Sequence, residues 1–176
     1  FARCDSLECV LFPASLKAFV DNTFVRCPTL VNADFGACTS LRFIGRRVLA
    51  SCGALNRVQF PPGLEEIGFA AFSDCARLVE VDLRPCKSLR AISDNAFRSC
   101  GLLETVVFPP SLEVIGRNAF VKCPALVNAD VSVCASLRRI GNASFRSIET
   151  VLSVPGLDQA VPPWARRSKT LPTPQH

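Results

Sequence analysis

The sequence predicts an α/β solenoid, with a parallel β-sheet along one side of a stack of turns and short helical or 3₁₀ turns along the other. Three observations support this prediction. Segment 24–34 returns almost unchanged as 120–130, leucines recur at intervals that alternate between 23 and 25 residues, and each interval holds the same succession of apolar residues. A fixed period of this size is typical of stacked, similar turns. Because short and long intervals alternate, the full repeating unit is a pair of turns that spans 48 residues.

The first part of each turn is predicted to form a β-strand. Apolar residues come three and five positions after the residue that opens the turn, as Val58 and Phe60 follow Leu55. A spacing of two places both side chains on one face of an extended strand. Proline then ends the strand in the short turns, because it has no backbone donor. The opening residues, called anchors below, are Leu7, Leu30, Leu55, Leu78, Leu103, Leu126 and Val151.

The second part of each turn lacks a period of two. A leucine is followed three residues later by isoleucine or phenylalanine, as at Leu112 and Ile115, then in four turns by glycine, and then by an Ala-Phe pair or its equivalent. We expect this part to form a short helix or 3₁₀ turn on the outer side. No turn has enough apolar residues to bury its own face, so stacking has to make the core continuous.

Residues 103–126 resemble the BspA-like leucine-rich repeats, whose pattern reads Leu-x-x-Val-x-Phe-Pro-x-x-Leu-x-x-Ile-Gly-x-x-Ala-Phe-x-x-Cys-x-x-Leu. The matching residues are Leu103, Val106, Phe108, Pro109, Leu112, Ile115, Gly116, Ala119, Phe120, Cys123 and Leu126. The resemblance covers about residues 1–154. It implies a curved solenoid with its parallel sheet on the concave side, and a non-catalytic module that binds a protein partner on that sheet, as in surface or adhesion proteins.

One repeat domain of about six turns is expected over residues 1–157, followed by a Pro- and Arg-rich tail over residues 158–176. Val151 replaces the anchor leucine near the end of the stack, and terminal repeats are usually atypical. Residues 1–4 align with the middle of a turn, and the chain has no methionine. We therefore expect an incomplete first turn and a longer native protein. Trp164 in the tail either folds back over the last turn or docks a partner.

The ten cysteines follow the repeat. Small, buried apolar side chains with free thiols are expected at row positions, because zinc sites need close ligand pairs that are absent here. Cys9 lies outside the rows and is predicted to face outward. One row holds Cys4, Cys27, Cys52, Cys75, Cys100 and Cys123, and a second holds Cys38, Cys86 and Cys134. Free thiols would suit a reducing compartment, whereas the family resemblance suggests the cell surface or secretion, so the localisation stays open.

Several classes of function are not supported by the sequence. The single histidine is the last residue, His176, and no phosphate-binding glycine loop is present, so neither catalysis nor a cofactor or metal is expected. The net charge is +5 with arginines in pairs, not in a long basic stripe, which does not indicate nucleic-acid binding. No apolar run approaches the roughly 18 residues that cross a membrane, so no membrane insertion is expected in these residues.

The candidate binding surface is the outward face of the predicted sheet. Positions two and four residues after each anchor should face outward, and they provide the candidate partner-binding residues Asn32, Asp34, Arg57, Gln59, Glu80, Asp82, Thr105, Asn128 and Asp130. The three aspartates recur on alternate turns, so they should lie roughly 10 Å apart and suit a basic segment of a protein ligand. A simpler interpretation is that these residues only solvate an exposed face.

Two other roles for the whole chain also stay open. It could be a structural scaffold or spacer subunit that stacks through an uncapped N-terminal end, or a regulatory domain of a longer enzyme. The partner's identity does not follow from the sequence.

Overall fold

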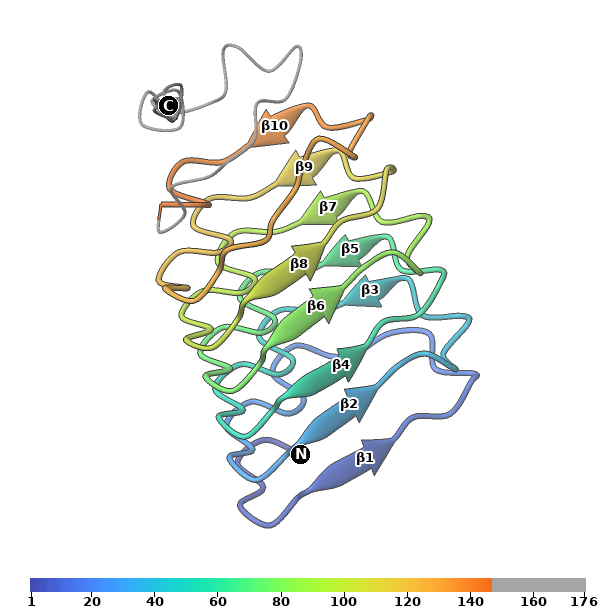
Figure 1. The fold of residues 1–176 in the computed structure, drawn as a ribbon. Helices are drawn as coiled ribbons and strands as arrows, with labels where there is room; N and C mark the ends of the chain where they lie inside the picture. The colour runs from blue at the N-terminus through green and yellow to red at the C-terminus, as the bar shows by residue number, and fades with distance from the viewer. Residues whose placement is uncertain (147–176) are drawn as a thin grey trace, which may run out of the picture.

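Ten short, parallel strands form the regular structure of residues 1–146, the part of the chain that the computed structural model describes. Along one side of the stack lie β1 (Cys9–Leu11), β2 (Asn32–Asp34), β4 (Arg57–Gln59), β6 (Glu80–Asp82) and β8 (Thr105–Val107). Along the other lie β3 (Phe43–Ile44), β5 (Glu66–Ile67), β7 (Ala91–Ile92), β9 (Val114–Ile115) and β10 (Arg139–Ile140). Figure 1 shows these two series, called the first and second sheets below, as two parallel stacks of arrows.

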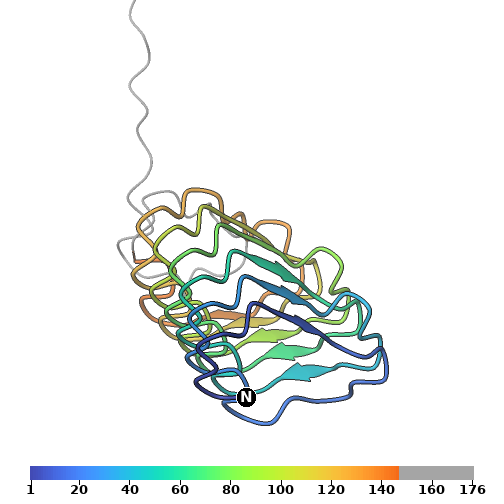
Figure 2. The same ribbon diagram turned by 90° about the horizontal axis from the view of Figure 1, so that it is seen from below.

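Each turn of the chain contributes to both sheets, and the turns follow one another along the stack. In the view from below, the turns lie one behind another with the N-terminal turn in front (Figure 2). The first sheet consists of the ladders β1-β2-β4 and β6-β8, and β4 contacts β6. The second sheet is one ladder in the order β3-β5-β7-β9-β10. The parallel β-solenoid predicted from the repeat is therefore confirmed.

The strand register follows the predicted period. Ala33 pairs with Val58 between β2 and β4, and Val81 pairs with Val106 between β6 and β8. All four of these central residues are buried, whereas the residues beside them in each strand are exposed or half-buried. The alternation of buried and exposed residues in this sheet is as the sequence predicts.

The second part of each turn differs from the prediction. No helix or 3₁₀ turn is present in residues 1–146; the Leu-x-x-Ile segments form the second sheet, and the residues after them form successive turns. The backbone explains the difference. Ala70 and Asp74 have φ values of 52° and 60°, and such left-handed residues interrupt a right-handed helix. The N–H groups of Phe72 and Asp74 donate instead to the carbonyls of Ala96 and Arg98 in the next turn, at 2.8 and 2.7 Å.

The same arrangement recurs in successive turns. Pairs of left-handed residues four positions apart are Asn22 and Arg26, Arg47 and Ser51, Ala70 and Asp74, Asn95 and Ser99, and Asn118 and Lys122. These outer turns, residues 20–27, 45–52, 68–75, 93–100 and 116–123, thus form a third side of the stack that is linked by backbone hydrogen bonds between turns. The backbone groups that a helix would have paired internally are paired here between neighbours.

The core lies between the two sheets and the outer turns and is built from rows of like residues. Phe72, Phe97, Phe120 and Phe145 are fully or almost fully buried. Their rings stack in succession with centroid separations of 5.2, 5.3 and 5.2 Å and nearly parallel planes. Offset-stacked aromatic pairs at such distances are favourable beyond their apolar burial. The repeated Ala-Phe step of the sequence therefore provides the packing between turns.

A glycine row marks the closest approach between turns. A Cβ atom at Gly116 would lie 2.4 Å from the backbone nitrogen of Asp94, and one at Gly68 would lie 2.6 Å from the carbonyl oxygen of Ile44. Gly45 and Gly141 are similarly enclosed by the preceding turn. The Gly116 N–H donates to the Ile92 carbonyl at 2.7 Å. Glycine is thus required here for close contact between backbones.

The cysteine rows are buried, and every cysteine is a free thiol. The thiols of Cys52, Cys75, Cys100 and Cys123 donate to backbone carbonyls of the preceding turn over 3.1 to 3.3 Å. Each of these four cysteines thus fills a small apolar site and also supplies a weak donor to a backbone carbonyl. The prediction of an outward Cys9 is confirmed, and so is that of buried row thiols for eight of the nine row cysteines; the ninth, Cys4, is half-buried.

We expect thiol titration to separate these groups. In the native chain, a thiol reagent should react rapidly with Cys9 and more slowly with Cys4, because the other eight thiols are buried. After denaturation all ten cysteines should react. The measurement is the reagent-coupled absorbance with and without denaturant under non-reducing conditions. A native chain in which most thiols react at once, or a denatured chain in which most do not react, would contradict the buried free-thiol assignment.

Candidate functional site

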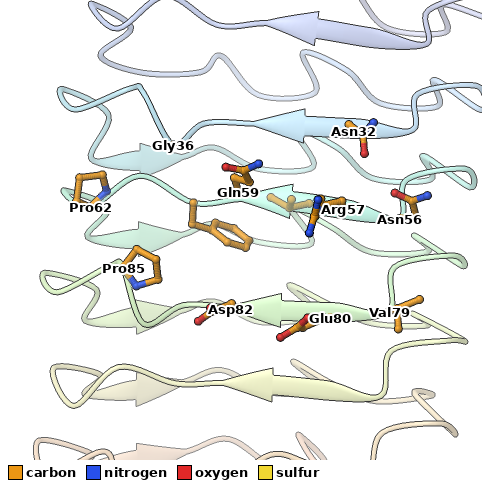
Figure 3. A pocket seen from close by; sticks show the side chains of 12 residues that line it. Asn32, Gly36, Asn56, Arg57, Gln59, Pro62, Val79, Glu80, Asp82 and Pro85 are labelled. Carbon is orange, nitrogen blue, oxygen red and sulfur yellow. The ribbon is translucent and has the colours of Figure 1, made fainter.

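The outward face of the first sheet carries an open groove across three neighbouring strands. Its volume is about 990 Å³, and its lining includes Asn32 of β2, Arg57 and Gln59 of β4, and Glu80 and Asp82 of β6. Figure 3 shows these side chains distributed over adjacent strands, with Pro62 and Pro85 at one end of the groove and Asn56 and Val79 at the other. Amide, guanidinium and carboxylate groups are therefore presented side by side on a rigid backbone.

The same face becomes apolar towards the later turns. A hollow of about 570 Å³ is lined by Val107 of β8 and by Pro110, Val127 and Val133. Val127 is 63% exposed and Val133 is 46% exposed. These β-branched side chains stand in solvent on the same face as the groove of β2, β4 and β6, whose lining includes amide, guanidinium and carboxylate groups. The first sheet thus presents a polar groove and an apolar hollow on one face.

The structure places all nine sequence-predicted residues on this face. Eight of them are exposed or half-buried members of β2, β4, β6 and β8 or of the Thr105–Asn128 bridge that extends β8, and Asp130 follows that bridge. The Asn128 side-chain amide lies 3.4 Å from the Thr105 hydroxyl.

The three recurring aspartates have a structural role that the sequence analysis missed. One carboxylate oxygen of each accepts a hydrogen bond from the backbone N–H two residues later: Asp34 from Gly36, Asp82 from Arg84 and Asp130 from Ser132, over 2.8, 3.0 and 2.8 Å. This is the Asx-turn geometry that aspartate and asparagine favour at the start of a turn. The signal was available, because each aspartate lies near the end of a predicted strand, between its two inward-facing positions.

The aspartates are also unequal in charge environment. Arg84 donates to both carboxylate oxygens of Asp82, over 2.7 and 3.0 Å. This bidentate guanidinium contact holds the pKa of the Asp82 carboxyl below its usual range. Among residues 1–146, no ion pair involves Asp34 or Asp130. In the predicted acidic row, the central carboxylate of Asp82 is therefore neutralised, and the carboxylates of Asp34 and Asp130 on its two sides are not.

The two sheets differ in how their charges are arranged. The second sheet is bordered by a ladder of alternating sign, Arg42, Glu65, Arg90, Glu113 and Arg138, with ion-pair distances of 3.7, 3.3 and 3.8 Å for Arg42–Glu65, Arg90–Glu113 and Arg138–Glu113. The strand and flanking positions of the first sheet hold the acidic residues Glu8, Asp34, Glu80, Asp82, Glu104 and Asp130 and one basic residue, Arg57. The first sheet is thus acidic on a chain whose net charge is +5.

Two further observations bear on the chemistry of the described residues. Within residues 1–146, no three His, Cys, Asp or Glu side chains gather closely enough to hold a metal ion. A helix with the length and apolarity needed to span a bilayer is likewise not found in this part of the chain.

The apolar part of the face was missed because the sequence analysis considered only positions two and four after each anchor. Val127 comes one residue after Leu126, and Val133 lies in the following turn. Both line the hollow together with Val107 of β8. The 48-residue recurrence of valine at Val31, Val79 and Val127 could have drawn attention to this column. The predicted tail, residues 158–176 with Trp164, lies outside the described residues.

Comparisons with solved structures give the same fold. The chain is 28% identical to a leucine-rich repeat protein of T. pallidum, with 82% of this chain and 72% of that chain covered and a TM-score of 0.64. It is 26% identical to a leucine-rich repeat protein of Bacteroides ovatus, with 72% and 32% covered and a TM-score of 0.58. A leucine-rich cell surface protein of Faecalibacterium prausnitzii is 24% identical, with 74% and 34% covered and a TM-score of 0.64.

The chain spans about a third of the length of the B. ovatus and F. prausnitzii proteins. No curated protein matches the sequence. The model of the BspA type leucine-rich repeat region matches residues 1–84 and 35–152 with six copies. No catalytic family is indicated, and such repeats are typical of protein-interaction and surface modules. With its repeated rows, its parallel solenoid and this match over most of its length, the chain belongs to the BspA-type leucine-rich repeat family.

Proposed function

We propose that this chain is a non-catalytic interaction module that binds a protein partner on the outward face of the first sheet. The observation that supports this most directly is a contrast between rows. Positions that pack between turns repeat the same residue types along the stack, whereas the positions two residues after the anchors change at every turn. Those changing positions are Cys9, Asn32, Arg57, Glu80, Thr105 and Asn128.

This contrast favours a role in recognition. Packing between turns requires like residues in every turn, whereas specific binding requires a surface whose residues differ from one turn to the next. In a solenoid, each turn contacts only its neighbours, so identical interior rows are sufficient for stability. A face that differs from turn to turn can match one partner and reject others. The polar groove of about 990 Å³ and the neighbouring apolar hollow of about 570 Å³ provide both kinds of contact on one face. Protein interfaces combine an apolar centre with a polar rim in this way.

The same face offers little support for catalysis. The described residues include no histidine that could act beside its exposed carboxylates, since the only histidine of the sequence is His176. The recurring aspartates accept hydrogen bonds from backbone N–H groups. A general base needs a reacting group within hydrogen-bond reach and a group that orients it. A binding role needs no such catalytic groups and only the exposed side chains that the face presents. The alternative role as a scaffold or spacer would place the contacts at the ends of the stack instead.

Panning a random peptide library against the immobilised full chain tests the proposal. We expect peptides that bind the wild-type chain to bind Arg57→Glu at least about tenfold more weakly, a loss of about 1.4 kcal/mol, because Arg57 is the basic centre of the groove. The measurement is the dissociation constant of the selected peptides for each variant.

Arg98→Glu is the matched control, because it makes the same charge reversal at an exposed outer turn. Its affinity for the peptides should equal that of the wild type. Peptides that lose affinity for Arg98→Glu and keep it for Arg57→Glu would contradict a binding role for the first sheet. A library from which no binder is enriched would also count against it.

A further inference from the structure

The lining of the apolar hollow on the first sheet and the charges at its rim indicate the chemistry of the group that would occupy it. We propose that the hollow takes one large aliphatic or aromatic side chain from an extended, positively charged segment of a protein partner. This inference rests on the proposed function, since it assigns the chemistry of the partner to the same face.

The lining favours an apolar side chain. Val107, Val127 and Val133 contribute methyl groups, and Pro110 adds an apolar ring to the lining. Val127 and Val133 keep about half or more of their surface in solvent, although a soluble domain gains by covering adjacent apolar groups. The hollow, at about 570 Å³, is large enough for a phenylalanine or leucine side chain together with its backbone. An apolar group would displace water from these methyl groups.

The rim favours positive charge in the flanking residues of the partner. Glu104 lies between Val79 and Val127 in one column, because its N–H donates to the Val79 carbonyl at 2.8 Å and its carbonyl accepts from the Val127 N–H at 3.1 Å. Asp130 lines the hollow itself. Among residues 1–146, no ion pair neutralises Glu104 or Asp130.

The basic residue at the rim does not offset these charges. Arg84 lines the hollow, but its guanidinium is bound to Asp82 at 2.7 Å. The available charge around the hollow is therefore negative, on a chain with a net charge of +5. Electrostatic complementarity mainly selects the partner and accelerates encounter, so a cationic segment is favoured over an anionic one.

Three labelled peptides test this chemistry with the full chain. The first has one phenylalanine flanked on each side by two arginines, the second has glycine in place of phenylalanine, and the third has glutamates in place of arginines. In fluorescence anisotropy titrations at low salt, the first peptide should bind about tenfold or more tightly than the second, because one apolar side chain is buried. The third should show no saturable binding.

Two variants locate the binding site. Val127→Asn should lower the affinity for the first peptide about tenfold. Its matched control is Val20→Asn, at a valine that is also exposed (80%, against 63% for Val127) and is not part of the hollow, and this variant should bind like the wild type. Asp130→Asn should lower the affinity and flatten its dependence on salt. Asparagine retains the side-chain oxygen that accepts from the Ser132 N–H, so the fold should be unchanged.

Several results would overturn the inference. Equal binding of the arginine and glutamate peptides, or an unchanged affinity in Val127→Asn, would do so. Concentration-dependent self-association in sedimentation that Val127→Asn abolishes would assign the hollow to a second copy of this chain instead. Library peptides that depend on Arg57 yet lack basic and apolar residues would overturn this inference while leaving the proposed function intact. If no peptide binds the first sheet at all, both fail.

Discussion

Gly116→Ala should lower the free energy of unfolding by about 2–3 kcal/mol, the range expected when extra atoms are forced into a packed interior. The new Cβ would lie 2.4 Å from the Asp94 nitrogen and 2.5 Å from the Ser93 carbonyl carbon. Both neighbours are backbone atoms of the preceding turn, so no side-chain rotation can relieve the contact. The turn would have to move and lengthen the hydrogen bond from the Gly116 N–H to the Ile92 carbonyl, now 2.7 Å.

Gly53→Ala is the control, because a Cβ at Gly53 meets no atom within 4 Å. This variant should be as stable as the wild type or slightly more so, since alanine restricts the unfolded chain. Urea denaturation of both variants, followed by circular dichroism at fixed pH, measures the difference. Equal stability of Gly116→Ala and Gly53→Ala would show that the turns do not approach as closely as the structure has them.

Stability should also fall sharply between pH 9 and pH 10, because buried thiols resist ionisation. Burial raises the pKa of Cys52 and Cys86 from 9.0 to about 12 and that of Cys134 to about 11. Burial also raises the pKa of Cys75 well above the usual value. These thiols stay protonated in the folded chain at a pH at which they ionise in the unfolded chain.

The direction of the change in stability with pH follows from the number of protons that the folded and unfolded chains bind. Below pH 9 both states hold their protons, so the full stability is present; above pH 9 the unfolded chain releases protons first, and stability falls until the folded-state pKa is reached. Each thiol costs about 1.4 kcal/mol at pH 10, and the four together cost up to about 6 kcal/mol. That loss is comparable with the whole stability of a typical domain.

Urea denaturation at pH 8, 9 and 10 measures this dependence. Cys75→Ala is the informative variant, because it removes one thiol from the row. Its stability at pH 8 should be lower than that of the wild type, since it leaves a small cavity, but its loss between pH 9 and pH 10 should be smaller by about one thiol's share. A wild-type stability that is constant across this range would contradict the burial of the row thiols.

The architecture was accessible from sequence because the rows that make it are repeated. The anchors, the Ala-Phe step and the cysteines recur at matched intervals, and each recurrence reports a contact with the next turn. Gly116 stood out in the same way. The reason that glycine is needed at this position, a close approach between the backbones of two turns, is seen only in the structure.

The outer turns were predicted incorrectly as helical or 3₁₀ turns because local pattern does not reveal where a backbone N–H is directed. Phe72 could donate within its own turn or to Ala96 in the next, and both choices are compatible with the residue types. The choice depends on the neighbouring turn at hydrogen-bond distance, which is a property of the stack. The left-handed conformation of Ala70, a residue type that rarely adopts it, follows from that tertiary bonding.

The face of the first sheet was predicted in part. Positions with a period of two, such as Arg57 and Gln59, point outward as expected. Val127 was missed because it lies just before the regular alternation begins, and the Asx turn at Asp130 was missed because only its charge was considered. Both features lie next to the ends of the regular strand alternation, where a period-two pattern does not apply.

The most direct test of the account is the location of a bound peptide among the three sides of the stack. A photoreactive benzoylphenylalanine would replace Gln59 on the first sheet, Arg139 on the second sheet or Arg98 on the outer turns, all of which are exposed. Each full-length variant would be irradiated with a peptide selected on the wild-type chain, and cross-linked product would be measured by mass spectrometry. We expect cross-linking at Gln59 alone, whereas equal or greater cross-linking at Arg139 or Arg98 would contradict binding on the first sheet.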